Sequence, residues 1–209
     1  MARRPIVAVF GGGGPKAPTE AAHRLGRALA QMGVFVLTGG RGGVMKNVSK
    51  GVLEAGGHTI GILPWASPEA EEKANKYVEY AVYTGLGEGR NYLNALLCDA
   101  AVAMNGGAGT LSEIGLAMKL DRPLVYLGAW RFLNHKGNGF AARPWVEDDI
   151  AATAAVKDLV QVDPAQTWAE RFAEFAVPGQ EENLRLLREQ LEAWDGEALQ
   201  PNAGVRSET

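Results

Sequence analysis

Short apolar runs alternate along the chain with glycine-rich turns and longer amphipathic segments. The runs are rich in β-branched residues and stop at glycine or proline, which predicts buried strands at 5–10, 34–40, 58–64, 78–87, 101–107 and 123–128. The amphipathic segments predict helices at 19–33, 43–57, 89–100 and 110–123. Because strand, glycine turn and helix repeat in this order, we predict βαβ units, a parallel sheet and right-handed crossovers.

The segment 129–150 breaks the alternation, since it is aromatic, contains glycine and has no clean period. A loop of this length is often a lid or an oligomer contact, and a surface insertion is the alternative. The elements expected after it are a strand at 156–162 and helices at 163–175 and 180–194. We assign 1–195 to a single domain and 196–209 to a disordered tail.

Composition narrows the function classes. The 209 residues carry a formal net charge of -3, which makes nucleic acid an unlikely partner. The single cysteine, Cys98, cannot form an internal disulfide, and the three histidines are scattered, so we expect no metal site. The first apolar run is too short for a signal peptide, and no run reaches 18 apolar residues, so we expect a cytoplasmic protein without a membrane partner.

Three glycine clusters follow predicted strands, at 11–14, 39–43 and 106–109. Carboxyl ends of parallel strands meet at one edge of a sheet, and glycine lets backbone N–H groups approach a phosphate. We therefore predict a nucleotide or sugar-phosphate crevice, although tight βα turns alone are the alternative. The candidate ligand-binding glycines are Gly11, Gly12, Gly39, Gly40, Gly43, Gly106, Gly107 and Gly109.

Two further features point to the same edge. Thr110 and Glu113 form the T-x-x-E pattern of a capping box, but the three preceding glycines equally suit a phosphate site with Glu113 beside it. In "GLGEGRN", Arg90 opens a helix and can grip a phosphate bidentately, with a surface salt bridge as the alternative. Asn91 beside it is another candidate ligand-binding residue.

The stretches "GGRGGVM" at 39–45, "GLGEGRN" at 85–91 and "NGGAGTLSE" at 105–113 resemble the Lonely Guy-like superfamily, often labelled possible lysine decarboxylases. The resemblance implies a Rossmann-like, doubly wound α/β fold, with a mostly parallel sheet of about six or seven strands and helices on both faces. "GLGEGRN" is similar to the branch of molybdenum-cofactor carrier proteins. The hydrolases of the superfamily have P-G-G-x-G-T-x-x-E, and Asn105 stands here in place of the proline. No lysine in a pyridoxal-phosphate context supports decarboxylation.

The resemblance implies two functions. One is N-glycosidic hydrolysis of a nucleoside 5′-monophosphate, with Glu113 and Arg90 catalytic, Thr110 and the glycine amides on the phosphate, and no cofactor required. The other is a non-catalytic carrier of the molybdenum cofactor or a related nucleotide. The superfamily also implies a homodimer or larger assembly. Single-stranded DNA binding, as in the more distant DNA-processing protein A, fits the acidic balance poorly.

Overall fold

A computed structural model describes residues 4–67, 74–130 and 145–160, which belong to one compact unit spanning 4–162. The helices predicted at 163–175 and 180–194 and the tail 196–209 lie outside the described residues. No helix in the described ranges combines the length and apolarity needed to cross a membrane.

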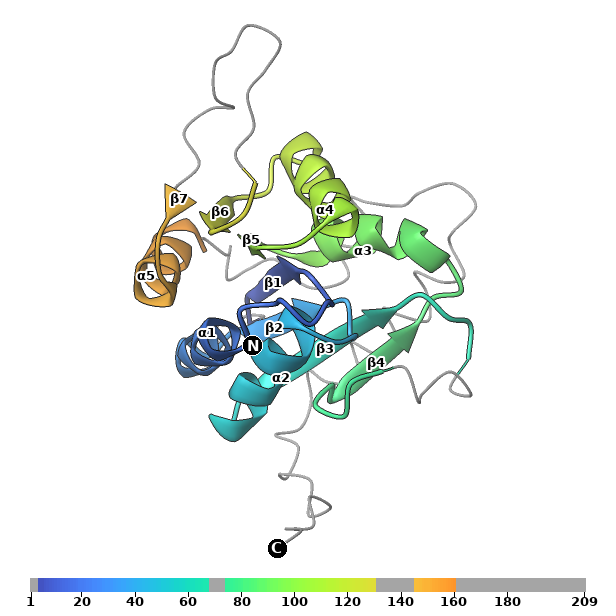
Figure 1. The fold of residues 1–209 in the computed structure, drawn as a ribbon, viewed down its shortest axis with the longest axis horizontal. Coiled ribbons are helices and arrows are strands. Elements are labelled where there is room, and N and C mark those ends of the chain that lie inside the picture. Colours follow the sequence, from blue (N-terminus) through green and yellow to red (C-terminus); the bar gives the residue numbers. More distant parts are fainter. Residues whose placement is uncertain (1–3, 68–73, 131–144, 161–209) are drawn as a thin grey trace, which may run out of the picture. The chain divides into compact units, whose positions relative to one another are not determined.

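A seven-stranded parallel sheet forms the centre of this unit, with the strand order β4-β3-β2-β1-β5-β6-β7 (Figure 1). The strands are β1 Ile6–Gly11, β2 Phe35–Thr38, β3 His58–Leu63, β4 Tyr80–Tyr83, β5 Ala100–Met104, β6 Leu124–Leu127 and β7 Trp145–Val146. The helices are α1 Thr19–Gln31, α2 Val44–Glu54, α3 Arg90–Leu97, α4 Ala108–Lys119 and α5 Asp149–Leu159, with a 3-10 turn η2 at Gly87–Gly89. The predicted Rossmann-like α/β fold is confirmed.

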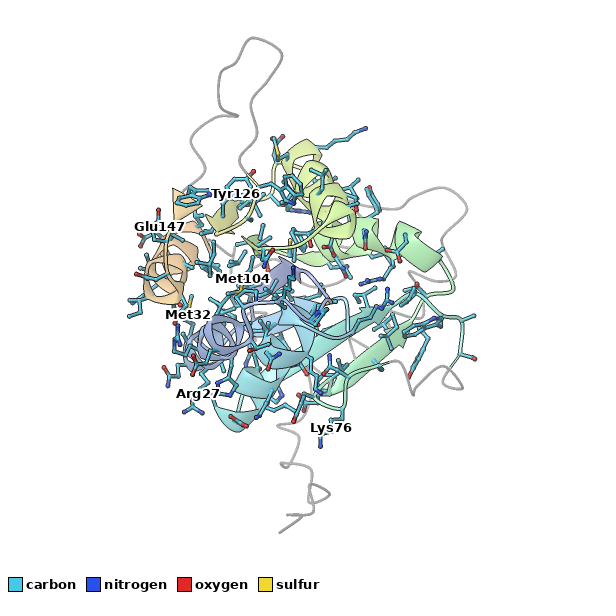
Figure 2. The ribbon with its side chains drawn as sticks, in the orientation of Figure 1. Arg27, Met32, Lys76, Met104, Tyr126 and Glu147 are labelled. Atoms are coloured by element: carbon cyan, nitrogen blue, oxygen red, sulfur yellow. The ribbon has the colours of Figure 1, made fainter. Side chains whose placement is uncertain are left out.

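Helices cover both faces of the sheet. Figure 1 shows α1, α2 and α5 on one face and α3 and α4 on the other. Alternate residues of β1 point to the face covered by α1, α2 and α5. There Val7 and Val9 pack with Leu25 of α1 and Val48 of α2 in a buried cluster. Figure 2 shows Met104, which belongs to this cluster, in the interior of the unit, whereas Arg27 lies at its surface.

The order of strands reverses at β1. The chain runs outward from β1 through β2 and β3 to β4, and then returns to place β5 on the other side of β1. The loops after β1 and β5 therefore lead to helices on opposite faces. Such a switch point opens a crevice beyond the carboxyl ends of the strands. The glycine clusters after β1 and β5 both lie there.

The strand predicted at 156–162 is wrong, because residues Asp149–Leu159 form α5. The sequence IAATAAVKDL is rich in alanine, the best helix former, and the Asp148 carboxylate caps the helix by accepting the Ala151 amide at 2.8 Å. The seventh strand is instead Trp145–Val146, inside the segment expected to be irregular. The remainder of that segment, 131–144, lies outside the described residues.

Candidate functional site

A cavity of about 300 Å³ lies at the switch point. It brings together the turns after β1 and β2, the η2 turn and the first turns of α3 and α4. The predicted site residues that line it are Gly11, Gly12, Arg90, Asn91, Gly107, Gly109, Thr110 and Glu113. Residues far apart in the sequence thus share one cavity, as the glycine clusters led us to expect.

Arg90 is a buried cation on the cavity wall, with only 4% of its surface exposed. Its Nη1 donates to the Ile62 carbonyl at 3.0 Å, while Nε is buried without a hydrogen-bond partner in the described part of the chain. None of the ion pairs found among the described residues includes Arg90. Burial lowers the pKa of Arg90, whereas the charge of Glu113 raises it. The Arg90 guanidinium is therefore buried without an ion-pair partner among the described residues, although the charge of Glu113 acts on it.

Gly39 makes room for that guanidinium. A Cβ atom at position 39 would overlap the Nη1 atom of Arg90. Gly39 thus leaves the space that the Arg90 guanidinium occupies, without itself lining the cavity. This close approach explains why the strand exit needs a glycine here.

The first turn of α4 supplies backbone donors. The helix begins at Ala108, with Gly107 as its N-cap and no side-chain cap, and its first turn holds no acidic residue. The first N–H groups of a helix have no partner within it, so the amides of Gly109 and Thr110 are available near the cavity. The capping-box interpretation of Thr110 and Glu113 is wrong, because the helix starts two residues before Thr110.

Glu113 is buried one turn further along α4, with 7% of its surface exposed. Its Oε1 accepts a hydrogen bond of 2.6 Å from Nδ2 of Asn94 on α3. Burial raises the pKa of Glu113 to about 7, although the Asn94 bond and the charge of Arg90 both lower it. Near neutral pH this carboxyl group is therefore poised between its charged and neutral forms.

Sequence reasoning missed several residues of the site, above all Arg41 and Glu88. Both line the cavity, and Arg41 Nη1 lies 3.8 Å from Glu88 Oε1. The Asn75 side chain fixes the Arg41 backbone by donating to its carbonyl at 3.0 Å. The signal was present, since Arg41 is the one charged residue inside the glycine cluster 39–43. The other unpredicted lining residues are Gly13, Gly42 and Met45.

Four predicted residues do not line this cavity: Gly39, Gly40, Gly43 and Gly106. Gly106 lines a neighbouring cavity with Asn105, whose backbone φ of 53° is in the left-handed region. The Asn105 Oδ1 accepts the Gly106 amide at 2.6 Å, which stabilises this turn. The Gly106 carbonyl accepts from Trp130 Nε1 at 3.2 Å.

The site suits an anion better than a metal ion. In the described ranges no group of three or more His, Cys, Asp or Glu residues is arranged to hold a metal. A buried guanidinium and a helix N-terminus instead offer N–H donors to oxygen atoms of a phosphate or a similar anion.

With this geometry established, comparison with known proteins gives the family. A model of the SLOG cluster4 family matches residues 4–160, and the chain belongs to this family. The predicted membership of a Lonely Guy-like Rossmann branch is confirmed. Among curated proteins, the rice cytokinin riboside 5′-monophosphate phosphoribohydrolase LOG is 35% identical over 96 residues. That alignment covers 46% of this chain and 39% of the rice enzyme, so much of the enzyme has no counterpart in it.

Solved structures of similar fold include molybdenum-cofactor proteins. The molybdenum cofactor binding protein from Rippkaea orientalis is 33% identical, with a TM-score of 0.66, covering 76% of this chain and 99% of that one. The molybdenum cofactor carrier protein from Chlamydomonas reinhardtii is 36% identical, with a TM-score of 0.63, covering 75% and 98%. The similarity to these two proteins extends over nearly their whole length.

Proposed function

We propose that this protein binds a phosphorylated small molecule of the nucleotide or pterin type in the cavity at the switch point. The phosphate lies between the guanidinium of Arg90 and the first-turn amides of α4, with the Thr110 side chain beside it. The rest of the ligand extends past Glu113 and the mouth residues Arg41 and Glu88.

This proposal rests mainly on the buried charge of Arg90, which forms no ion pair within the described residues. Removing a guanidinium from water costs several kcal/mol unless an opposite charge or a set of hydrogen bonds replaces the water. One carbonyl, from Ile62, accepts from Arg90, and Nε is left without a partner in the described residues. A phosphate in the cavity would supply an opposite charge and would accept from the guanidinium of Arg90, which lines the cavity wall.

The carrier function is the first candidate for what the protein does with its ligand. The two molybdenum-cofactor proteins align over nearly their whole length, whereas the rice hydrolase aligns over 39%. Asn105 also stands in the position of the hydrolase proline, and its φ of 53° cannot be adopted by proline, whose ring fixes φ near −65°. The turn before α4 thus has a backbone that the hydrolase motif excludes. The cargo would be the molybdenum cofactor or a similar phosphorylated pterin.

Hydrolysis of a nucleoside 5′-monophosphate is the second candidate, favoured by Glu113. In that reaction the bond between the base and C1′ of the ribose breaks, and water adds to C1′. The transition state resembles an oxocarbenium ion, which an ionised Glu113 would stabilise while Arg90 holds the phosphate. A pKa of about 7 also allows Glu113 to exchange a proton with water during the reaction.

Two measurements on the full chain test these alternatives. Isothermal titration with AMP, and with molybdenum cofactor under exclusion of oxygen, measures binding. Chromatography of the AMP sample then detects any free adenine. Binding without release of base supports the carrier, and release that Glu113→Gln abolishes supports the hydrolase. Absence of binding to both compounds at about 100 μM would refute the proposal.

Arg90→Met tests the phosphate contact itself. Hydrogen bonds to a charged group contribute about 1.5–3 kcal/mol, so the variant should bind at least about tenfold more weakly. Arg27→Met is the matched control, because Arg27 is an exposed arginine on α1 and lines none of the cavity. Equal losses in the two variants would mean that net charge, and not the site, determines affinity.

A further inference from the structure

Two asparagines on α3 form hydrogen bonds with residues in the first half of α4. Asn91 Nδ2 donates to Ser112 Oγ at 2.7 Å, and Asn94 Nδ2 donates to Glu113 Oε1 at 2.6 Å. Residues three apart lie on one face of a helix, so α3 presents both amides to α4. Ser112 in turn donates to the Gly109 carbonyl at 2.7 Å. The two bonds therefore hold two consecutive residues of α4, of which Glu113 lines the cavity.

Asn94 differs from Asn91 because it has no part in the cavity wall. It is fully buried, with 0% of its surface exposed, while Asn91 lines the cavity. Its neighbours on α3, Leu93 and Ala95, are buried and apolar. Asn94 thus places a polar amide in the interior, where it contacts Glu113 and not a ligand.

Packing alone does not explain why a polar asparagine occupies this buried position. The Asn94 Oδ1 is buried without a hydrogen-bond partner in the described part of the chain. An unpaired buried carbonyl oxygen destabilises the fold, whereas leucine at the same place would fill the space with no polar atom. The stabilising counterpart is the short bond from Nδ2 to the Glu113 carboxylate.

The charged groups around Glu113 oppose one another. Arg90 at the start of α3 favours the ionised carboxylate, while Glu88 of η2 disfavours it. Arg41 after β2 is the other cation on the cavity wall. Burial also favours the neutral form, and it is the largest influence on the pKa of Glu113. Asn94 is the one side chain in the described residues that hydrogen-bonds Glu113 directly.

We propose that Asn94 is a positioning residue, which aims the Glu113 carboxylate at the ligand and stabilises its ionised form. This inference rests on the proposed function for its purpose, although the bond itself does not depend on any ligand. A donor that bonds more strongly to the charged form than to the neutral form stabilises the charged form. The Nδ2 group of Asn94 is such a donor, since a hydrogen bond to an ionised carboxylate is stronger than one to the carbonyl oxygen of a protonated carboxyl group.

A carboxyl ¹³C NMR titration of the ligand-free full chain tests the inference. The Glu113 signal is identified by its loss in Glu113→Gln. In Asn94→Leu the midpoint of this signal should rise by about one pH unit or more, because the variant loses a hydrogen bond to a charged group. Asn94→Asp keeps the size of the side chain and should also raise the midpoint, since it sets a second carboxylate beside the first.

The outcomes separate this inference from the proposed function. If either folded variant leaves the midpoint within roughly 0.3 pH units of the wild type, Asn94 has only a packing role and the inference is overturned. If the midpoint rises but the wild type binds neither AMP nor molybdenum cofactor, the coupling stands and the proposed function fails. If the wild type does bind AMP, the pH profile of its affinity should move with the NMR midpoint in Asn94→Leu. An unchanged profile would refute the role of Asn94 in aiming Glu113 at the ligand.

Discussion

Replacing Glu113 by glutamine should stabilise the protein, and the gain should grow with pH. The carboxyl group has a pKa raised to about 7 in the fold, against an ordinary value of 4.5. A raised pKa means that Glu113 favours folding only in its protonated form. This favourable contribution is complete below pH 4.5 and is lost as the pH rises to 7. Glutamine keeps a neutral side chain whose carbonyl can still accept from Asn94.

The magnitude follows from the two pKa values. A tenfold change in proton affinity corresponds to about 1.4 kcal/mol, so at pH 8 ionised Glu113 lowers the free energy of unfolding by about 3 kcal/mol. At pH 5 the loss is about 1 kcal/mol, because the folded protein is then mostly protonated at Glu113. The stability difference between Glu113→Gln and the wild type should therefore increase by about 2–3 kcal/mol between pH 5 and pH 8.

Urea unfolding monitored by tryptophan fluorescence at both pH values measures this difference. Glu88→Gln is the matched control, because its carboxylate lines the same cavity but its side chain is 71% exposed. Because this side chain is exposed to water, its replacement should not reproduce the gain in stability expected of Glu113→Gln. If Glu113→Gln is less stable than the wild type at pH 8, or if its advantage does not depend on pH, the buried-carboxyl reasoning is refuted.

The remaining predictions concern the two turns that shape the cavity. Gly39→Ala should displace the Arg90 guanidinium and weaken AMP binding at least about tenfold, whereas Gly115→Ala, where an added Cβ meets no atom within 4 Å, should not. Isothermal titration measures both, and equal affinities would contradict the close contact. Asn105→Pro should destabilise the fold by more than about 1 kcal/mol in urea unfolding, because proline cannot adopt φ of 53°, while Asn105→Gly should stay close to the wild type. A stable Asn105→Pro variant would show that the turn readily takes the hydrolase backbone.

Six of the seven strands, β1 to β6, could be predicted because each of them carries its own signal, whereas the two-residue strand β7 was missed. Runs such as "PIVAVF" are apolar and end at glycine, and the structure makes this one β1, Ile6–Gly11. The error at 156–162 came from reading "VKDLVQV" as a strand by its valines. The helix in this region is favoured by residues that precede Val156, namely the Asp148 cap and the alanines that follow it. A prediction from residues 156–162 alone does not include them.

The site could be predicted only in part, because most of its contacts join residues that are far apart in the sequence. Glu113 and Arg90 were found because they belong to motifs with glycine. The partner of Glu113 was missed, because Asn94 lies in the apolar stretch "YLNALL", where nothing local distinguishes a polar contact from packing. Gly39 was expected to bind ligand, but the space that it leaves for Arg90 is visible only once the fold brings the two residues together.

Binding of the proposed ligand would be coupled to the proton on Glu113 through the charges of the cavity. A phosphate beside Glu113 favours its neutral form, because two like charges at short distance repel. A carrier tolerates a neutral carboxyl group there, whereas a glycosidic hydrolase needs the carboxylate opposite the developing positive charge. Asn94 opposes the proton uptake, so its hydrogen bond favours the form that hydrolysis requires. Calorimetry of AMP binding in two buffers with different ionisation enthalpies counts the protons taken up. Uptake of close to one proton near pH 8 argues for a carrier, and uptake near zero argues for a site that keeps Glu113 charged for chemistry.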